Sequence, residues 1–122
     1  MPRDAVAVTD LAANAGVAAP AGTAISPTNG ANIANFGDGG RVVVRVTNTN
    51  GTDRTVTVKA GVNPPSVREG LGDLAVVVAA TSGVKYLVLE TARFQKADGS
   101  IDIDFEASMA GNISALRIPK AV

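Results

Sequence analysis

The clearest signal in the chain is a strict alternation of apolar and polar residues in its middle third. In "RVVVRVTN" (41–48), Val42, Val44 and Val46 share one face, because alternate residues of a strand point the same way. "RTVTVKAG" (54–61) repeats the pattern. The Asn-Gly pair between the two segments favours a tight turn, so together they predict a β-hairpin.

Further apolar segments, bounded by turn residues, predict more strands. The segments "DLAVVVAA" (73–80), "VKYLVLE" (84–90), "IDIDFEA" (101–107) and "ISALRIP" (113–119) are of this kind. The spacing is typical of an all-β protein, and we expect a single antiparallel β-sandwich or jelly-roll-like domain of about seven or eight short strands. The expected domain covers 25–122, and the small, weakly patterned residues 1–24 form an N-terminal arm or irregular lead-in.

Two of the predicted strands are apolar on both faces. Val77 faces away from Val76 and Val78, and Tyr86 faces away from Leu87. A two-layer sandwich buries only one face of each sheet, so the second face needs another cover. The N-terminal arm, the protein's own loops and a neighbouring subunit are the three alternatives.

Composition removes several classes of chemistry. The chain of 122 residues contains no Cys and no His, which excludes disulfides, thiolate nucleophiles, Ser-His-Asp triads and the usual transition-metal sites. Eleven basic residues balance eleven acidic ones, so we expect neither a nucleic-acid nor a membrane partner. Asp4 and Asp10 interrupt the apolar N-terminus, which predicts a protein made in the cytoplasm without a secretory signal.

The stretch "IDIDFE" (101–106) is the strongest candidate for a catalytic or metal-binding row. Asp102, Asp104 and Glu106 share one face of the predicted strand, with neighbours roughly 6.5–7 Å apart. That separation overlaps the range of glycosidase carboxylate pairs, but the chain has no Trp to stack on a sugar. A calcium site needs converging loop oxygens, not a straight row. We therefore interpret the row as the solvated face of an amphipathic strand.

Other motif matches are weak. "GLGDLA" (Gly70–Ala75) has the glycine spacing of a dinucleotide fingerprint but is followed by a strand-like run, and "DGG" (Asp38–Gly40) lacks the continuation of a phosphate loop. Arg41 and Arg45 share a strand face and offer contacts to an acidic partner, although surface cations are usually only solvated. We expect no catalytic residue, no cofactor and no metal site, and hence no enzyme.

Most of the chain, from "TNGANI" through "TNTNGTDRTVTVKAG", "DLAVVV" and "RFQKADGSIDIDF" to "ISALRIP", resembles the capsid decoration or cement proteins of tailed phages. The resemblance lies in the pattern of Val-rich strands and hairpins. It implies a head-stabilising protein on the outside of a virion capsid, made in the bacterial host cytoplasm. The implied partners are the major capsid protein and further copies of the chain, with a trimer favoured. A tail or fibre component and a carbohydrate-binding or adhesive module are the alternatives.

Overall fold

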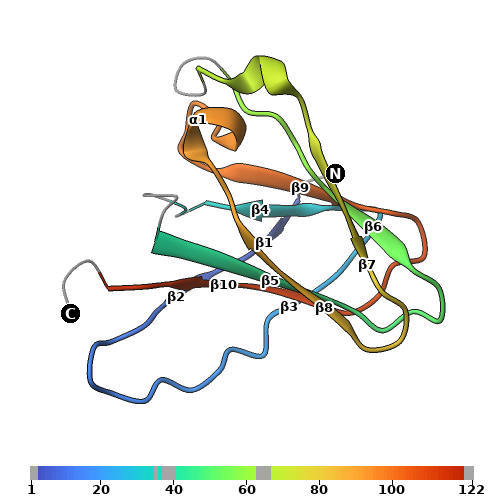
Figure 1. Cartoon of the computed structure of the whole chain (residues 1–122), viewed down its shortest axis with the longest axis horizontal. Coiled ribbons are helices and arrows are strands. Elements are labelled where there is room, and N and C mark those ends of the chain that lie inside the picture. The colour runs from blue at the N-terminus through green and yellow to red at the C-terminus, as the bar shows by residue number, and fades with distance from the viewer. Residues whose placement is uncertain (1–2, 35, 37–40, 63–66, 120–122) are drawn as a thin grey trace.

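The protein is a β-sandwich of two packed, mixed sheets with one short helix (Figure 1). The structure is a computed structural model that describes residues 3–34, 36, 41–62 and 67–119. The predicted β-sandwich is confirmed. The prediction of a purely antiparallel fold is wrong, because each sheet contains one parallel pair of strands.

Ten strands form in the described part of the chain, more than the sequence predicted, because several elements are only two or three residues long. Sheet A has the order β1-β4-β9-β6-β7, and sheet B has the order β2-β10-β5-β8, with β3 also paired to β10. The helix α1 (Thr91–Phe94) and a 3-10 turn (Glu69–Leu71) lie in connections. The strands are β1 (Asp4–Ala5), β2 (Val8–Asp10), β3 (Thr23–Ala24), β4 (Ala31–Ile33), β5 (Val42–Asn48), β6 (Arg54–Val58), β7 (Leu74–Val78), β8 (Gly83–Val88), β9 (Ile101–Phe105) and β10 (Asn112–Arg117).

Alternation along the central strands builds the core between the sheets. Val42, Val44 and Val46 of β5 are fully buried, as are Ile101 and Ile103 of β9. The predicted inward faces of both strands are therefore confirmed. β-branched side chains dominate this layer because they pack well on a pleated surface. The other fully buried large side chains are Ile33, Phe36, Val56, Val58, Val78, Leu89 and Ile113.

The N-terminal segment, expected as an arm or irregular lead-in, pairs with both sheets. β1 runs parallel to β4 at the edge of sheet A, and β2 runs parallel to the second half of β10 in sheet B. Between them Val6 is only 4% exposed, and its amide donates to the carbonyl of Asn32 at 2.9 Å. The segment therefore crosses from one sheet to the other on the same molecule, and these two pairs are the parallel ones that the sequence pattern did not predict.

The predicted hairpin between residues 41–48 and 54–61 is wrong. β5 pairs with β10 and β8 in sheet B, whereas β6 pairs with β7 and β9 in sheet A. The Asn-Gly turn thus joins two sheets instead of two neighbouring strands. Likewise "RFQKADGSIDIDF" is no hairpin, since it contains part of α1 and the whole of β9, whose partners are β4 and β6.

A buried asparagine holds the corner where the chain leaves sheet B. Asn48 at the end of β5 is fully buried, and its side-chain amide donates to the carbonyls of Thr52 (3.0 Å) and Val78 (3.1 Å). Its Oδ1 accepts from the amide of Asn50 at 3.0 Å. Val78 ends β7 in the opposite sheet, so this one side chain links the two sheets and satisfies backbone groups that the corner leaves without ladder partners.

We expect Asn48→Ala to lower the free energy of unfolding by about 2 kcal/mol, because buried carbonyls lose their donors. The matched control is Asn112→Ala at the exposed start of β10, which should change it by less than about 0.5 kcal/mol. Urea titrations followed by circular dichroism measure both values. Equal stability of the two variants would contradict the role assigned to Asn48.

Candidate functional site

The carboxylate row of β9 lies on the outer face of sheet A, as the alternation predicted, but it is not simply solvated. The side chain of Asp104 is 45% exposed and that of Glu106 is 40% exposed. Asp102 is only 16% exposed because cations lie over it. The row is therefore a set of ion pairs, which the sequence pattern alone did not reveal.

Arg3 binds this row from the N-terminal arm. Its Nη1 donates to the backbone carbonyl of Ile103 at 2.9 Å and to Oδ1 of Asp104 at 2.5 Å, while its Nε lies 3.4 Å from Asp102. Gly30 provides the space, since a side chain there would meet the guanidinium, and its φ of +72° is a conformation that glycine adopts readily. Arg3 thus links β1 to β9. In the sheet these two strands are separated by β4, the strand with which β1 pairs.

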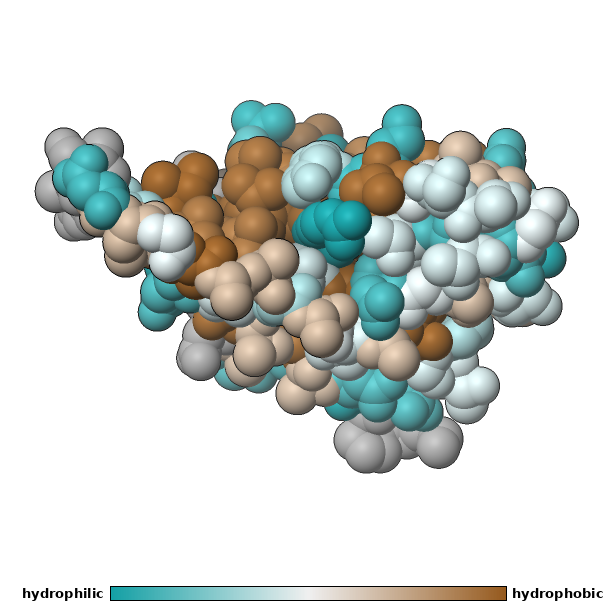
Figure 2. Space-filling model, turned by 90° about the horizontal axis from the view of Figure 1, so that it is seen from below, coloured by the Kyte–Doolittle hydropathy of each residue, from teal (hydrophilic) through white to brown (hydrophobic). Residues whose placement is uncertain are grey.

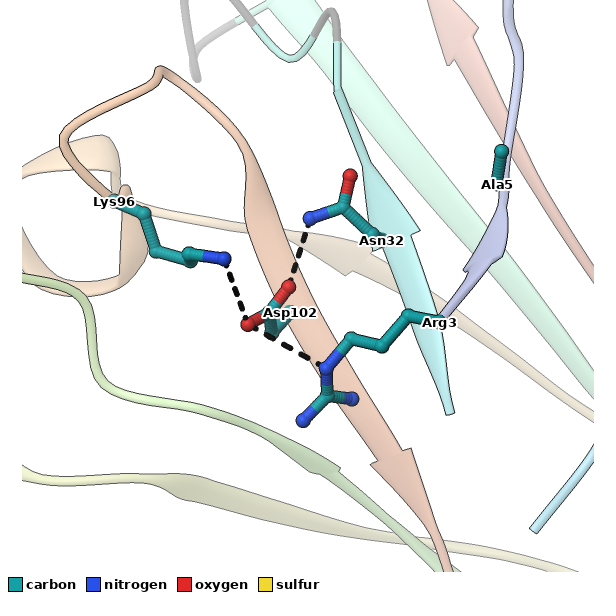
Figure 3. Close-up of a pocket in the computed structure, with 5 residues that line it drawn as sticks. All are labelled: Arg3, Ala5, Asn32, Lys96 and Asp102. Atoms are coloured by element: carbon teal, nitrogen blue, oxygen red, sulfur yellow. Dashed lines mark hydrogen bonds and ion pairs between the residues drawn. The ribbon is translucent and has the colours of Figure 1, made fainter. Parts of the chain in front are cut away.

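Figure 3 shows how Asp102 is surrounded. Asn32 on β4 donates to Oδ1 of Asp102 at 2.7 Å, and Lys96 reaches Oδ2 at 3.1 Å from the loop after α1. With Arg3 and Ala5, these residues line an open pocket of about 330 Å³. All three polar side chains point at the same carboxylate, so the charges of the pocket are largely satisfied by one another.

Ion pairs continue along the outer face of sheet A. Lys59 donates to Asp73 at 2.8 Å and lies 4.0 Å from Asp104. Its hydrogen bond with Asp73 raises the pKa of Lys59 above 10.5 and lowers the pKa of Asp73 below 3.8. Arg54 donates to Glu106 at 2.7 Å, and this bond, with one from the Thr55 amide, holds the pKa of Glu106 below its usual 4.5.

This arrangement favours charge pairing over acid–base chemistry. A glycosidase acid needs a carboxyl whose pKa is raised by its surroundings, whereas the pKa of Glu106 is lowered. Asp102 and Asp104 both pair with the guanidinium of Arg3. Within the described ranges, no three acidic side chains converge in a way that would hold a metal ion. No described helix is long and apolar enough to cross a membrane.

The remaining predicted motifs are distributed as follows. Gly70–Ala75 runs from the 3-10 turn into β7, so a strand follows the glycines and the helix that a dinucleotide site requires is absent from this stretch. Asp38–Gly40 lies outside the described residues. Arg41 donates from Nε to the carbonyl of Ile118 at 3.0 Å, next to the end of β10.

The outer face of sheet B is largely apolar, and residues 11–20 lie over only part of it. On β8, Val84, Tyr86 and Val88 are 39%, 64% and 68% exposed. Val43 on β5 is the cross-strand partner of Val88, and it extends the same face to Leu116 on β10; both side chains are half-buried. Figure 2 views this side, and apolar side chains gather in the half of it that lies toward the C-terminal end of β10.

The sequence left open what covers the second face of the two-faced strands. The N-terminal segment pairs with the far edges of the sheets, and residues 11–22 run below sheet B (Figure 1), where they form a groove with Tyr86 but leave this side chain 64% exposed. On β7, Val77 is also 54% exposed. Neither the arm nor the described loops therefore bury these side chains.

We expect Arg3→Met to loosen the N-terminal segment selectively. The amides of Asp4 and Val6, bonded to the carbonyls of Gly30 and Asn32, should exchange with solvent roughly fivefold to tenfold faster, since the lost ion pairs are partly exposed. Hydrogen exchange measured by NMR gives these rates. The control, Arg54→Met, removes an ion pair on the same face without touching β1, and unchanged rates in Arg3→Met would contradict the pinning role.

Glu106 predicts a defined acid dependence of stability. Because its pKa is lowered on folding, its carboxylate stabilises the fold fully above pH 4.5, and this contribution is lost as the pH falls through the lower folded-state pKa. The melting temperature of Glu106→Gln should therefore lie below that of the parent at pH 7, and the gap should close below pH 4.5. In an Arg54→Met background the gap at pH 7 should be smaller. A gap that stays constant from neutral to acidic pH would argue against this pairing.

Comparison of the chain with protein-family models, with curated proteins and with solved structures finds no significant match. The resemblance to phage decoration proteins thus stays a prediction from the sequence pattern. Any argument about function rests on the fold and the surfaces described above.

Proposed function

We propose that the protein is a structural virion protein that decorates the outside of a phage capsid and stabilises the shell, with the major capsid protein as its partner. One observation carries the proposal: the outer face of sheet B presents Tyr86 and Val88, which are 64% and 68% exposed, beside the half-buried Val43 and Leu116. A contiguous apolar face on a small domain is typical of a protein that functions against another protein surface.

The contrast between the two outer faces supports this proposal. The outer face of sheet A carries the Asp102–Asp104 row with its cations, a surface suited to water. The opposite face is apolar. A protein that covers a shell needs this polarity, with one side buried against the shell and the other in solvent. Each contact is modest in energy, but many repeated contacts raise the shell's resistance to heat and internal pressure.

The strand order supports the jelly-roll part of the prediction. From β3 to β10 the chain supplies eight strands that form the orders β3-β10-β5-β8 and β4-β9-β6-β7. Among these eight strands, β6 and β7 are the one pair that follow each other in the chain and also lie side by side in one sheet. Each of the other connections crosses from one sheet to the other. Two interlocking four-stranded sheets of this kind are the architecture of jelly rolls, which occur widely in viral capsid proteins and in lectins.

Oligomerisation belongs to the same proposal. The outer edges of β7 and β8 carry no further strand in the described chain, and further copies clustered at a junction of shell subunits, with a trimer favoured, would shield them. A tail or fibre protein would share these surfaces, so the copy number in the particle separates the alternatives.

The test is quantitative mass spectrometry of purified particles against the major shell protein. We expect a copy number of the same order as that of the shell subunit, and shells stripped of the protein should release DNA at a lower temperature than complete shells. A few copies per particle would instead indicate a tail or vertex component. Absence from particles would contradict the virion proposal and favour the sugar-binding module, which a glycan array would then examine.

A further inference from the structure

The outer face of sheet B contains a half-buried cation that has no anionic partner in the described chain. Arg45 points outward from the middle of β5, between Ser114 on β10 and Tyr86 on β8. Within the described part of the chain, its guanidinium makes neither a hydrogen bond nor an ion pair. Most other arginines of the described chain, including Arg3, Arg54 and Arg68, bind a carboxylate or a carbonyl. Arg45 therefore differs from the paired arginines on the outer face of sheet A.

Arg45 lies in a groove with a second free polar group. The groove has a volume of about 380 Å³ and lies between sheet B and residues 11–20, with Leu11, Val17 and Leu116 among its walls. Ser114 also lines it. This residue is 7% exposed, and its hydroxyl has no hydrogen-bond partner among the described residues. A guanidinium and a hydroxyl thus face one small space with apolar walls.

The surroundings of the groove offer no anion of their own. Strands β5, β8 and β10 contain no acidic residue, and neither do residues 11–22. On the described strands of sheet B the one acidic residue is Asp10, at the end of β2, and it is paired with Arg117 at 3.2 Å. Removing a guanidinium partly from water without a counter-charge is unfavourable, so an anion supplied from outside would be bound favourably.

We propose that the outer face of sheet B docks a partner protein through a carboxylate of an acidic side chain flanked by apolar residues. The planar guanidinium of Arg45 binds the carboxylate through two parallel hydrogen bonds, and the Ser114 hydroxyl donates a third to the same group. Tyr86, Val88 and Leu116 cover the flanking apolar side chains. In the proposed function the partner is the shell subunit, but the inference concerns the chemistry of this face and does not require that identity.

Charge opposes the pairing of this face with the same face of a second copy of the chain. Two copies apposed through this face would bring two Arg45 side chains together, with no carboxylate from β5, β8 or β10 to separate them. A small free carboxylate would fill the groove but leave Val84 and Val88 exposed outside it. A protein surface satisfies both the charge and the apolar area.

The experiment is an NMR titration of the full chain with two capped peptides. One peptide contains Asp between two Leu residues, and the other contains Asn at the same place. We expect the Asp peptide to shift the amide signals of Arg45, Tyr86 and Leu116, and the Asn peptide to bind about tenfold more weakly, because bonds to charged groups are the stronger ones. Arg45→Gln should abolish the preference for Asp, and Ser114→Ala should reduce it.

Lys85→Gln is the matched control, since it removes a neighbouring exposed cation from β8 and should leave the preference unchanged. Each variant is first shown to be folded by its amide spectrum. Equal binding of the two peptides, no binding of either, or an equal loss in Lys85→Gln would overturn the inference. A third titration uses octanoate, and binding as tight as that of the Asp peptide would overturn it in favour of a small-molecule site. The particle experiment is independent of these titrations, so one proposal can fail while the other stands.

Discussion

The hydrophobic core between the two sheets is the constraint on which the other features depend. Burial of Val44 on β5 forces Arg45 outward on sheet B, and burial of Ile103 on β9 forces Asp102 and Asp104 outward on sheet A. A slip of one residue in either strand would place charges in the core, so the register is strongly specified. The chemistry of both outer surfaces thus follows from which residues the core requires.

Alternation is a local property, which explains why the sequence predicted the inward faces of the central strands and the β-sandwich correctly. The predicted hairpin failed because an Asn-Gly turn looks the same within one sheet and between two. What distinguishes the cases is the bond from Asn48 to the carbonyl of Val78, thirty residues away in the chain. The parallel strands of the arm escaped prediction for the same reason, since Arg3 contacts residues one hundred positions away.

The surfaces were predictable to different extents. The outward carboxylates of β9 and the two-faced character of β8 are visible in single segments, because both rest on a period of two. The cations that cover Asp102 come from β1 and from the loop after α1, and no periodicity joins those segments. The groove at Arg45 likewise needs residues 11–20 to form its second wall. The sequence therefore indicated which strands carry exposed groups, but not which distant segments contact them.

The distribution of edges and faces favours docking through a face. The arm covers one edge of β4 and of β10 with the short strands β1, β2 and β3, so β7 and β8 are the longer strands of the described chain that lie at a sheet edge. On β8, Lys85 lies opposite the buried Val46 and therefore shares its inward face, and inward-pointing charges on edge strands oppose edge-to-edge pairing. Tyr86 and Val88 on the other face of the same strand have no such protection. Association through this face leaves Lys85 in water and buries the apolar side chains, which is the energetically better outcome.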